Sequence, residues 1–168
     1  MTTVDDVRAV IPNADPEQVK KVLALKKKAW PYSFRAERDL VALRAKLEAT
    51  FQPGDKGNAA GAKRYKIAGR LASKRGSGGI AFLDVEGQDG KLQAILDKSE
   101  MGDKAFDEAL HLLNAGDWVG IQGYGMRSKR GEPSIGAEKV TLLAKSLVPL
   151  VDLRSADNPE LRYGKPYI

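Results

Sequence analysis

The feature of this sequence that most limits its fold is a change of hydrophobic period near residue 64. Before it, apolar residues recur every three to four positions, as in Leu40, Leu43 and Leu47, which is the spacing of one helix face. After it, apolar and polar residues alternate, as in Tyr65, Lys66 and Ile67, which is the spacing of a half-buried strand. The sequence therefore predicts a helical extension followed by a mainly β domain.

Five strands are predicted in the second region, with one helix between the third and the fourth. Turn residues separate them, notably at 74–79, 87–90 and 128–131. The order β-β-β-α-β-β matches the OB-fold, a five-stranded Greek-key barrel whose second and third strands carry an oligonucleotide-binding face. Glycines inside the strands would allow its bends. The predicted elements are strands at about 64–73, 80–86, 91–96, 118–126 and 134–143, a helix at 103–113, and strand glycines at Gly69, Gly120, Gly123 and Gly125.

Two helices are predicted ahead of the barrel. Asp15, Pro16 and Gln18 form a helix start, with Asp15 as N-cap and Gln18 reaching back as in a capping box. The first helix is expected to run from Pro16 to about Ala29 and the second from about Arg35 to Phe51, followed by a flexible linker at 52–62. We therefore expect an N-terminal basic helical extension and linker over 1–62, the OB-fold domain over 63–146 and a C-terminal arm over 147–168.

Composition excludes most catalytic designs. The chain has 168 residues, no cysteine and a single histidine, His111. Disulfides, thiolate nucleophiles, most zinc sites and most serine triads need residues that it lacks or has once. His111 falls in the predicted helix at 103–113, where a solvated or half-buried histidine is the ordinary interpretation. We expect no catalytic residue, no metal and no cofactor.

Hydropathy indicates a cytoplasmic protein without a membrane partner. The longest apolar runs, such as Val140–Ala144, are far shorter than the roughly 20 residues that a membrane-spanning helix needs. Residues 1–13 lack the apolar centre of a secretory signal.

Positive charge is concentrated in the N-terminal half. Residues 17–75 contain sixteen Lys or Arg and five Asp or Glu, a net charge of +11, whereas residues 1–16 carry −2 and residues 76–168 carry −3. Such a block is often only a solvated helix face, but beside an oligonucleotide-type barrel it favours a surface that binds phosphates. Lys20, Lys27 and Lys28 of the first helix are expected to contact a nucleic-acid backbone.

The predicted barrel supplies the side-chain types that single-stranded nucleic acid requires. Stacking needs an aromatic, reading of a base edge needs an amide or carboxylate, and the backbone needs cations. Phe82 lies in the second strand, Gln93 in the third, Arg75 near the first turn and Glu132 at the last turn. Each also has an ordinary interpretation, Phe82 as a core residue and the others as surface polar groups.

An ordered series of motifs resembles the N-terminal anticodon-binding domain of class II lysyl-tRNA synthetases. The resemblance covers about residues 16–163. Related aspartyl and asparaginyl enzymes share its Arg, Phe and Gln positions, but the turn at 129–134 points to the lysyl branch. The matching motifs are residues 66–85, Gly90-Lys-Leu-Gln93, Gly116-Asp-Trp-Val-Gly120, Lys129-Arg-Gly-Glu-Pro-Ser-Ile135 and Leu147-Val-Pro-Leu150, with the Trp-Pro-Tyr-Ser-Phe segment ending at Phe34 and Asn158-Pro-Glu-Leu-Arg-Tyr163 on either side.

The resemblance implies a role for each candidate residue. Phe82 would stack on the central uridine of the anticodon, Arg75 and Gln93 would contact the same base, and Glu132 would complete the uridine-reading set. Lys74, next to Arg75 in the sequence, is also expected to contact the nucleic acid. Pro133 stands where the family usually has leucine.

The sequence then departs from the family, because the catalytic domain and its ATP motifs are missing. We expect a domain that binds the anticodon loop of lysine tRNA, is part of or derived from a lysyl-tRNA synthetase, and is no enzyme alone. A synthetase catalytic domain is a possible partner. Two alternatives remain open: a general single-stranded nucleic-acid binder, and a protein-interaction module that docks a synthetase catalytic subunit.

Overall fold

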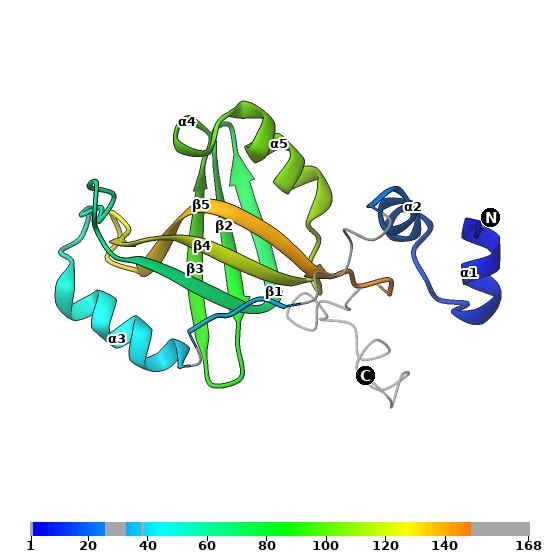
Figure 1. Cartoon of the computed structure of the whole chain (residues 1–168), viewed down its shortest axis with the longest axis horizontal. Helices are drawn as coiled ribbons and strands as arrows, with labels where there is room; N and C mark the ends of the chain where they lie inside the picture. Colours follow the sequence, from blue (N-terminus) through cyan, green and yellow to red (C-terminus); the bar gives the residue numbers. More distant parts are fainter. Residues whose placement is uncertain (1, 26–32, 38, 149–168) are drawn as a thin grey trace, which may run out of the picture.

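The computed structural model describes residues 2–25, 33–37 and 39–148. Within these residues, three helices precede the strands where two were predicted, and two helices separate β3 from β4 where one was predicted (Figure 1). The order of the five strands, with the helical segment between the third and the fourth, is as predicted. The elements are α1 (Val4–Val10), α2 (Pro16–Leu25), α3 (Leu40–Thr50), β1 (Arg64–Ser77), β2 (Ile80–Glu86), β3 (Lys91–Asp97), α4 (Lys98–Met101), α5 (Asp103–Leu112), β4 (Trp118–Arg127) and β5 (Pro133–Ala144).

The strands close into a barrel in the order β1-β2-β3-β5-β4. All neighbours are antiparallel except β3 and β5, which pair in parallel from Gln93 opposite Ser134 to Leu96 opposite Ala137. This is the arrangement of the OB-fold, so the predicted fold class, mainly β with flanking helices, is confirmed.

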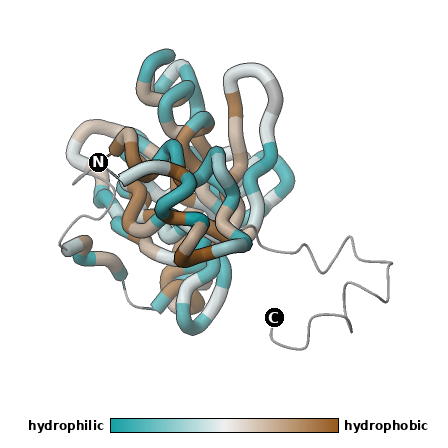
Figure 2. The backbone as a smooth tube through the Cα atoms, turned by 90° about the vertical axis from the view of Figure 1, so that its right-hand side faces the viewer, coloured by the Kyte–Doolittle hydropathy of each residue, from teal (hydrophilic) through white to brown (hydrophobic). Residues whose placement is uncertain are grey.

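The core fills the barrel and its two ends. Alternate residues of β2 and β3 point inward and are at most 1% exposed, namely Ala81, Leu83, Val85, Leu92, Ala94 and Leu96. Phe106 of α5 and the predicted apolar face of α3, which consists of Leu40, Leu43 and Leu47, join the same cluster. Figure 2 shows the hydrophobic stretches mostly in the middle of the molecule and the projecting loops mainly hydrophilic.

The first strand is longer than predicted. A turn was expected at 74–79, but β1 continues to Ser77, which pairs with Ile80. Only Gly78 and Gly79 form the hairpin loop, and Gly78 has a φ of 67°, a conformation that glycine adopts without steric cost. Arg75 therefore lies on the strand, directly opposite Phe82.

The segment at 52–62 is not the flexible linker that its composition indicates. Lys56 forms a β-bridge with Met126, and the backbone N–H of Gly57 donates to the carbonyl of Gly125 at 2.9 Å. The backbone N–H of Gly54 donates to the carbonyl of Arg127 at 3.1 Å. Backbone pairing with β4 holds this segment in place, and a polar composition does not reveal such pairing.

The helix starts also differ from the prediction. α3 begins at Leu40 and not at Arg35, because the Asp39 carboxylate accepts from the N–H of Ala42 at 2.7 Å and so caps it. In α2, Asp15 accepts from the N–H of Glu17 at 2.8 Å. Gln18 does not complete a capping box, since the N–H of Asp15 donates instead to the carbonyl of Leu147 at 2.7 Å. The predicted end of this helix at Ala29 lies outside the described residues, as does most of the 147–168 arm.

Gly123 shows why the closely packed strands of this barrel need glycine. A Cβ on Gly123 would lie 1.9 Å from the carbonyl oxygen of Gly136, far inside contact distance. The register of β4 against β5 shifts at this point, as expected where a strand bends. Within the described ranges, the helices are all too short or too polar to cross a membrane.

Candidate nucleic-acid interface

The outward face of β1, β2 and β3 brings three of the candidate residues together. Because Ala81 and Leu83 point into the core, Phe82 between them points outward, and it is half-buried. Its cross-strand neighbours are Arg75 on β1 and Ile95 on β3. An aromatic ring thus lies between a cation and an aliphatic side chain, outside the core.

A second row of side chains runs beside this one. Ser73 lies opposite Asp84, Asp84 opposite Gln93, and Gln93 opposite Ser134 of β5. The two rows together form a surface of mixed apolar and polar groups on the outside of the barrel. We call it the platform, and it consists of Ser73, Arg75, Phe82, Asp84, Gln93 and Ile95. Ser134 itself is 0% exposed and lies beneath the edge of this surface.

Arg75 is held in place on the platform by Asp84. The Arg75 Nη2 atom donates to both carboxylate oxygens of Asp84, at 3.1 and 3.0 Å, and the Ser73 hydroxyl donates to the same carboxylate. The side chains of Arg75 and Asp84 are 63% and 29% exposed. The pair therefore orients the guanidinium beside the Phe82 ring while leaving part of it open to a ligand.

Glu132 lies at the end of the platform where β5 begins. The Ser134 hydroxyl is 3.1 Å from Oε1 of Gln93 and 3.0 Å from the carbonyl oxygen of Glu132, so it links the two residues. The Glu132 carboxylate forms an ion pair with Arg44 of α3 at 2.8 Å. Sequence reasoning did not find Arg44, since nothing local relates a helix residue to a turn 88 positions later.

Lys74 lies away from the platform, although it is adjacent to Arg75 in sequence. Its Nζ donates to the carbonyl oxygens of Leu110 and Leu113 at 2.7 Å, at the carboxyl end of α5. Burial, together with the neighbouring Lys21 and Lys145, lowers the pKa of Lys74. Alternation along the strand sends consecutive side chains to opposite faces, so Lys74 holds α5 against the barrel.

Beside half-buried Lys74 lies a fully buried lysine, Lys145. We call this region the α5 junction, and it consists of Lys74, Asn114, Asp117 and Lys145. The Lys145 Nζ donates to Asp117 at 2.7 Å, to Asn114 at 3.0 Å and to the carbonyl of Leu112 at 2.6 Å. The side chains of Lys145 and Asp117 are 0% exposed. Burial lowers the pKa of Lys145, and the hydrogen bond that it donates to Asp117 opposes this shift. Sequence reasoning missed this cluster as well.

The basic helix is described only in part. Lys20 is exposed on α2 and pairs with Glu17 at 2.8 Å, whereas Lys27 and Lys28 lie outside the described residues. Lys21 reaches the α5 junction and donates to Asn114 at 2.9 Å. Figure 1 shows α1 and α2 to one side of the barrel.

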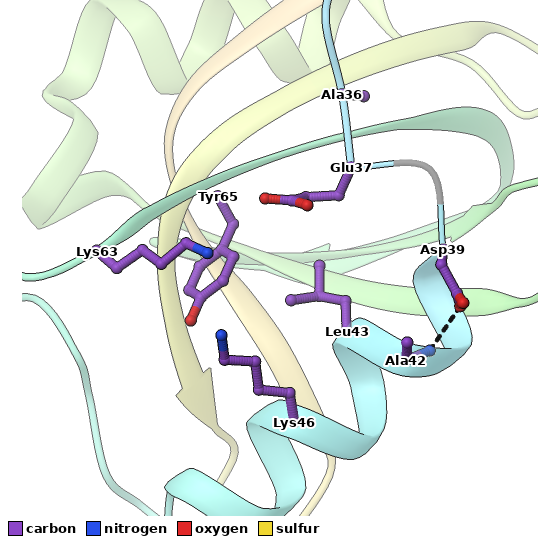
Figure 3. A pocket seen from close by; sticks show the side chains of 8 residues that line it. All are labelled: Ala36, Glu37, Asp39, Ala42, Leu43, Lys46, Lys63 and Tyr65. Atoms are coloured by element: carbon purple, nitrogen blue, oxygen red, sulfur yellow. Dashed lines mark hydrogen bonds between the residues drawn. The ribbon is translucent and has the colours of Figure 1, made fainter.

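An open groove of about 450 Å³ lies between α3 and the start of β1 (Figure 3). Lys46 and Lys63 extend toward Tyr65 on its floor, and the Lys63 Nζ is 4.9 Å from the centroid of the Tyr65 ring. Glu37 also faces the groove. Charges of both signs thus line it, in contrast to a site built for a single ion. In the part of the chain that the structure describes, no cluster of three or more acidic or histidine side chains is arranged to hold a metal ion.

Comparison with known proteins agrees with this geometry. Residues 65–143 match the tRNA anticodon family model, an OB-fold nucleic acid binding domain. A lysine–tRNA ligase of Thermosynechococcus vestitus is 36% identical over 143 residues, which are 82% of this chain and 28% of the relative. One from Dehalococcoides mccartyi is 38% identical over 104 residues, 61% of this chain and 21% of the relative.

A third relative extends the same pattern. Lysine–tRNA ligase 2 of Methanosarcina mazei is 32% identical over 140 residues, 83% of this chain and 26% of the relative. The chain therefore spans about a quarter of the length of the curated relatives it matches. The resemblance to the anticodon-binding domain of lysyl-tRNA synthetases is confirmed, and residues 65–143 are similar to the tRNA anticodon type of OB-fold nucleic acid binding domain.

Proposed function

We propose that this chain binds the anticodon loop of lysine tRNA through the platform. The observation that carries the proposal is the placement of Arg75, Phe82 and Gln93 on one outward surface. Phe82 and Gln93 lie on β2 and β3, the strands that carry the oligonucleotide-binding face of OB-folds, and Arg75 lies beside Phe82 on β1. The similarity to lysine–tRNA ligases supports a uridine-rich anticodon as the ligand.

Each platform residue has a distinct role in this proposal. The Phe82 ring stacks on the central base, because every base offers a π-face to an aromatic. The Gln93 amide reads the edge of that base with a donor and an acceptor. Arg75, oriented by Asp84, contacts the same nucleotide, and Glu132 at the end of the platform completes the set that reads it.

Other positive residues provide affinity without sequence information. We assign Lys20, Lys27 and Lys28 to the phosphates of the anticodon stem, since contacts to phosphate position a protein but do not specify a base. In this proposal residues 1–62 form the basic extension, 63–146 the reading domain and 147–168 an arm. The chain binds tRNA in the cytoplasm without catalysing a reaction itself, and a synthetase catalytic domain is a further partner.

Titration with anticodon stem-loops that differ only at the central base tests this function. A loop with uridine at the centre should bind several-fold more tightly than loops with a purine there. Equal binding of all loops would make the chain a general single-strand binder. Loss of binding at every salt concentration would make it a protein-interaction module.

Phe82→Leu is the matched variant, because it keeps an apolar side chain and removes the stacking ring. It should weaken binding to all loops that place a base on the ring. Gln93→Ala should instead reduce the preference for the central uridine, since an amide reads an edge and a ring reads only a face.

A further inference from the structure

A second part of the barrel surface, on the other side of β1 from the platform, carries an exposed tryptophan. Trp118 begins β4 and is 50% exposed. Its neighbour on β1 is Arg70, whose side chain is also exposed. Val119 and Ile121 of β4 are 0% exposed in the core, so Trp118 points outward, together with the strand positions in phase with it.

Two lysines share this outward face. Lys66 of β1 lies opposite Gln122 of β4, and Gln122 lies opposite Lys139 of β5. Both lysines are exposed. We call this surface the β1–β4 face, and it consists of Lys66, Arg70, Trp118, Gln122 and Lys139.

A second aromatic ring lies at the centre of this face. A Cβ on Gly120 would come within 2.7 Å of the ring of Phe34, so that ring rests directly on β4 between Trp118 and Gln122. Phe34 is half-buried there. The face therefore presents the exposed indole of Trp118 beside the half-buried ring of Phe34, with lysine and arginine side chains on either side.

The acidic side chains near this face are engaged elsewhere. Glu86, opposite Arg70 on the β2 side, is 3.2 Å from Lys91, and Glu138 is 2.8 Å from Arg64. The Glu37 carboxylate points toward Tyr65 (Figure 3). Among the described residues, no carboxylate lies within 4.0 Å of the charged groups of Lys66, Arg70 or Lys139. Within the described residues the positive charge of the face is thus unpaired, and an anionic ligand would complement it.

Single-stranded nucleic acid fits this combination of groups. An exposed ring with cations beside it provides stacking and phosphate contacts together. OB-folds cover about 4 to 16 nucleotides, more than a platform that reads one or two bases. Arg70 and Arg75 are five positions apart on β1, about 17 Å at the rise of a strand, so a strand leaving the platform reaches this face within a few nucleotides.

We propose that the β1–β4 face binds single-stranded nucleotides that continue from the platform. Trp118 stacks on a base, and Lys66, Arg70 and Lys139 contact phosphates. The inference rests on the proposed function for the kind of ligand, and it extends the binding site to a surface that recognises no particular base.

The fluorescence of Trp118 can report directly on binding at this face. The only other tryptophan in the sequence is Trp30, so a Trp30→Phe protein carries one indole. A uridine oligonucleotide of about 12 nucleotides should quench its emission, whereas one of about 4 nucleotides, which fills only the platform, should not. Saturation by the longer strand without any change in emission would overturn the proposal.

Affinity measurements in the parent chain provide the second test and do not depend on the Trp30→Phe protein. Trp118→Ala should weaken binding of the longer strand roughly tenfold and leave the shorter one unchanged, as expected for loss of one stacked base. Arg70→Ala should lower the salt dependence for the longer strand, with Lys104→Ala on α5 as the exposed control. Equal affinity of the parent and Trp118→Ala for the longer strand would contradict the proposal.

The two proposals can fail separately. Phe82→Leu should weaken both strands if the platform binds bases. If Trp118→Ala weakens binding and Phe82→Leu does not, the proposal for the β1–β4 face stands and the proposal for the platform is wrong. The opposite result would leave the platform alone.

Discussion

The α5 junction and the platform use cations in opposite ways. At the junction, half-buried Lys74 donates to two backbone carbonyls, and buried Lys145 donates to Asp117. On the platform, Arg75 is 63% exposed and its one ion pair with Asp84 leaves part of the guanidinium open. Lys74 and Arg75 are consecutive residues, yet one holds the fold and the other faces the proposed ligand.

This comparison shows that the net charge of a segment overstates the number of cations that are free to contact nucleic acid. The net charge of +11 over residues 17–75 includes Lys74, whose ammonium group is hydrogen-bonded to the end of α5. It also includes Arg44 and Lys56, which form ion pairs with Glu132 and Glu100. What a cation does depends on the face of the strand or helix that carries it. Stability and affinity should therefore respond to different substitutions.

The largest expected effect is on stability, at the junction. Lys145→Met removes one partner of a buried ion pair and leaves the Asp117 charge without it, which typically costs about 3 to 5 kcal/mol. Urea denaturation should show this loss, with Lys104→Met as the exposed control. A change below about 1 kcal/mol would mean that water reaches Asp117, contrary to the 0% exposure of its side chain.

The next effect is on affinity, at the platform. Phe82→Ala should weaken a uridine-centred loop by about 1 to 3 kcal/mol, the value of one base stacked on an aromatic. Its melting temperature should stay close to that of the parent, whereas Phe106→Ala in the core should lose about 3 to 5 kcal/mol of stability. Unfolding by Phe82→Ala would show that the ring belongs to the core.

Substitution of the consecutive residues Lys74 and Arg75 distinguishes the role of the α5 junction from that of the platform. Lys74→Ala should lower the free energy of unfolding by about 1 kcal/mol, since water replaces two hydrogen bonds at a helix end. Affinity for the stem-loop should not change. Arg75→Ala should give the reverse pattern, so parallel loss of affinity in both variants would place Lys74 in the interface.

The smallest effect is expected at Lys20. Because it is exposed and contacts a phosphate in the proposed complex, Lys20→Ala should reduce the slope of log K against log salt by about 0.7 to 0.9. All stem-loops should weaken alike. Selective loss for one anticodon, measured over the same salt series, would contradict its assignment to the backbone.

The sequence predicts the strands that carry the platform better than it predicts the contacts around them. Strand pattern alone leaves Phe82 open between a core residue and a stacking residue, and the family resemblance is what favours stacking. The alternation of β2 could have identified Asp84, two positions after Phe82 on the same strand face. The turn predicted from Lys74 begins four residues later, at Gly78, so Lys74 lies on β1 with its side chain toward α5. The Glu132 pair with Arg44 and the pairing of residues 54–57 with β4 are long-range contacts, which local pattern does not encode.

Mapping of backbone amide shifts by NMR tests the central claim most directly. Titration of the parent chain with a uridine-centred lysine anticodon stem-loop should move the amides of Arg75, Phe82, Asp84 and Gln93 most. The amides around Lys74 in the α5 junction, from Leu110 to Asp117, should change little. Shifts concentrated at the junction or on α3, with the β2 and β3 amides unmoved at saturation, would contradict the account.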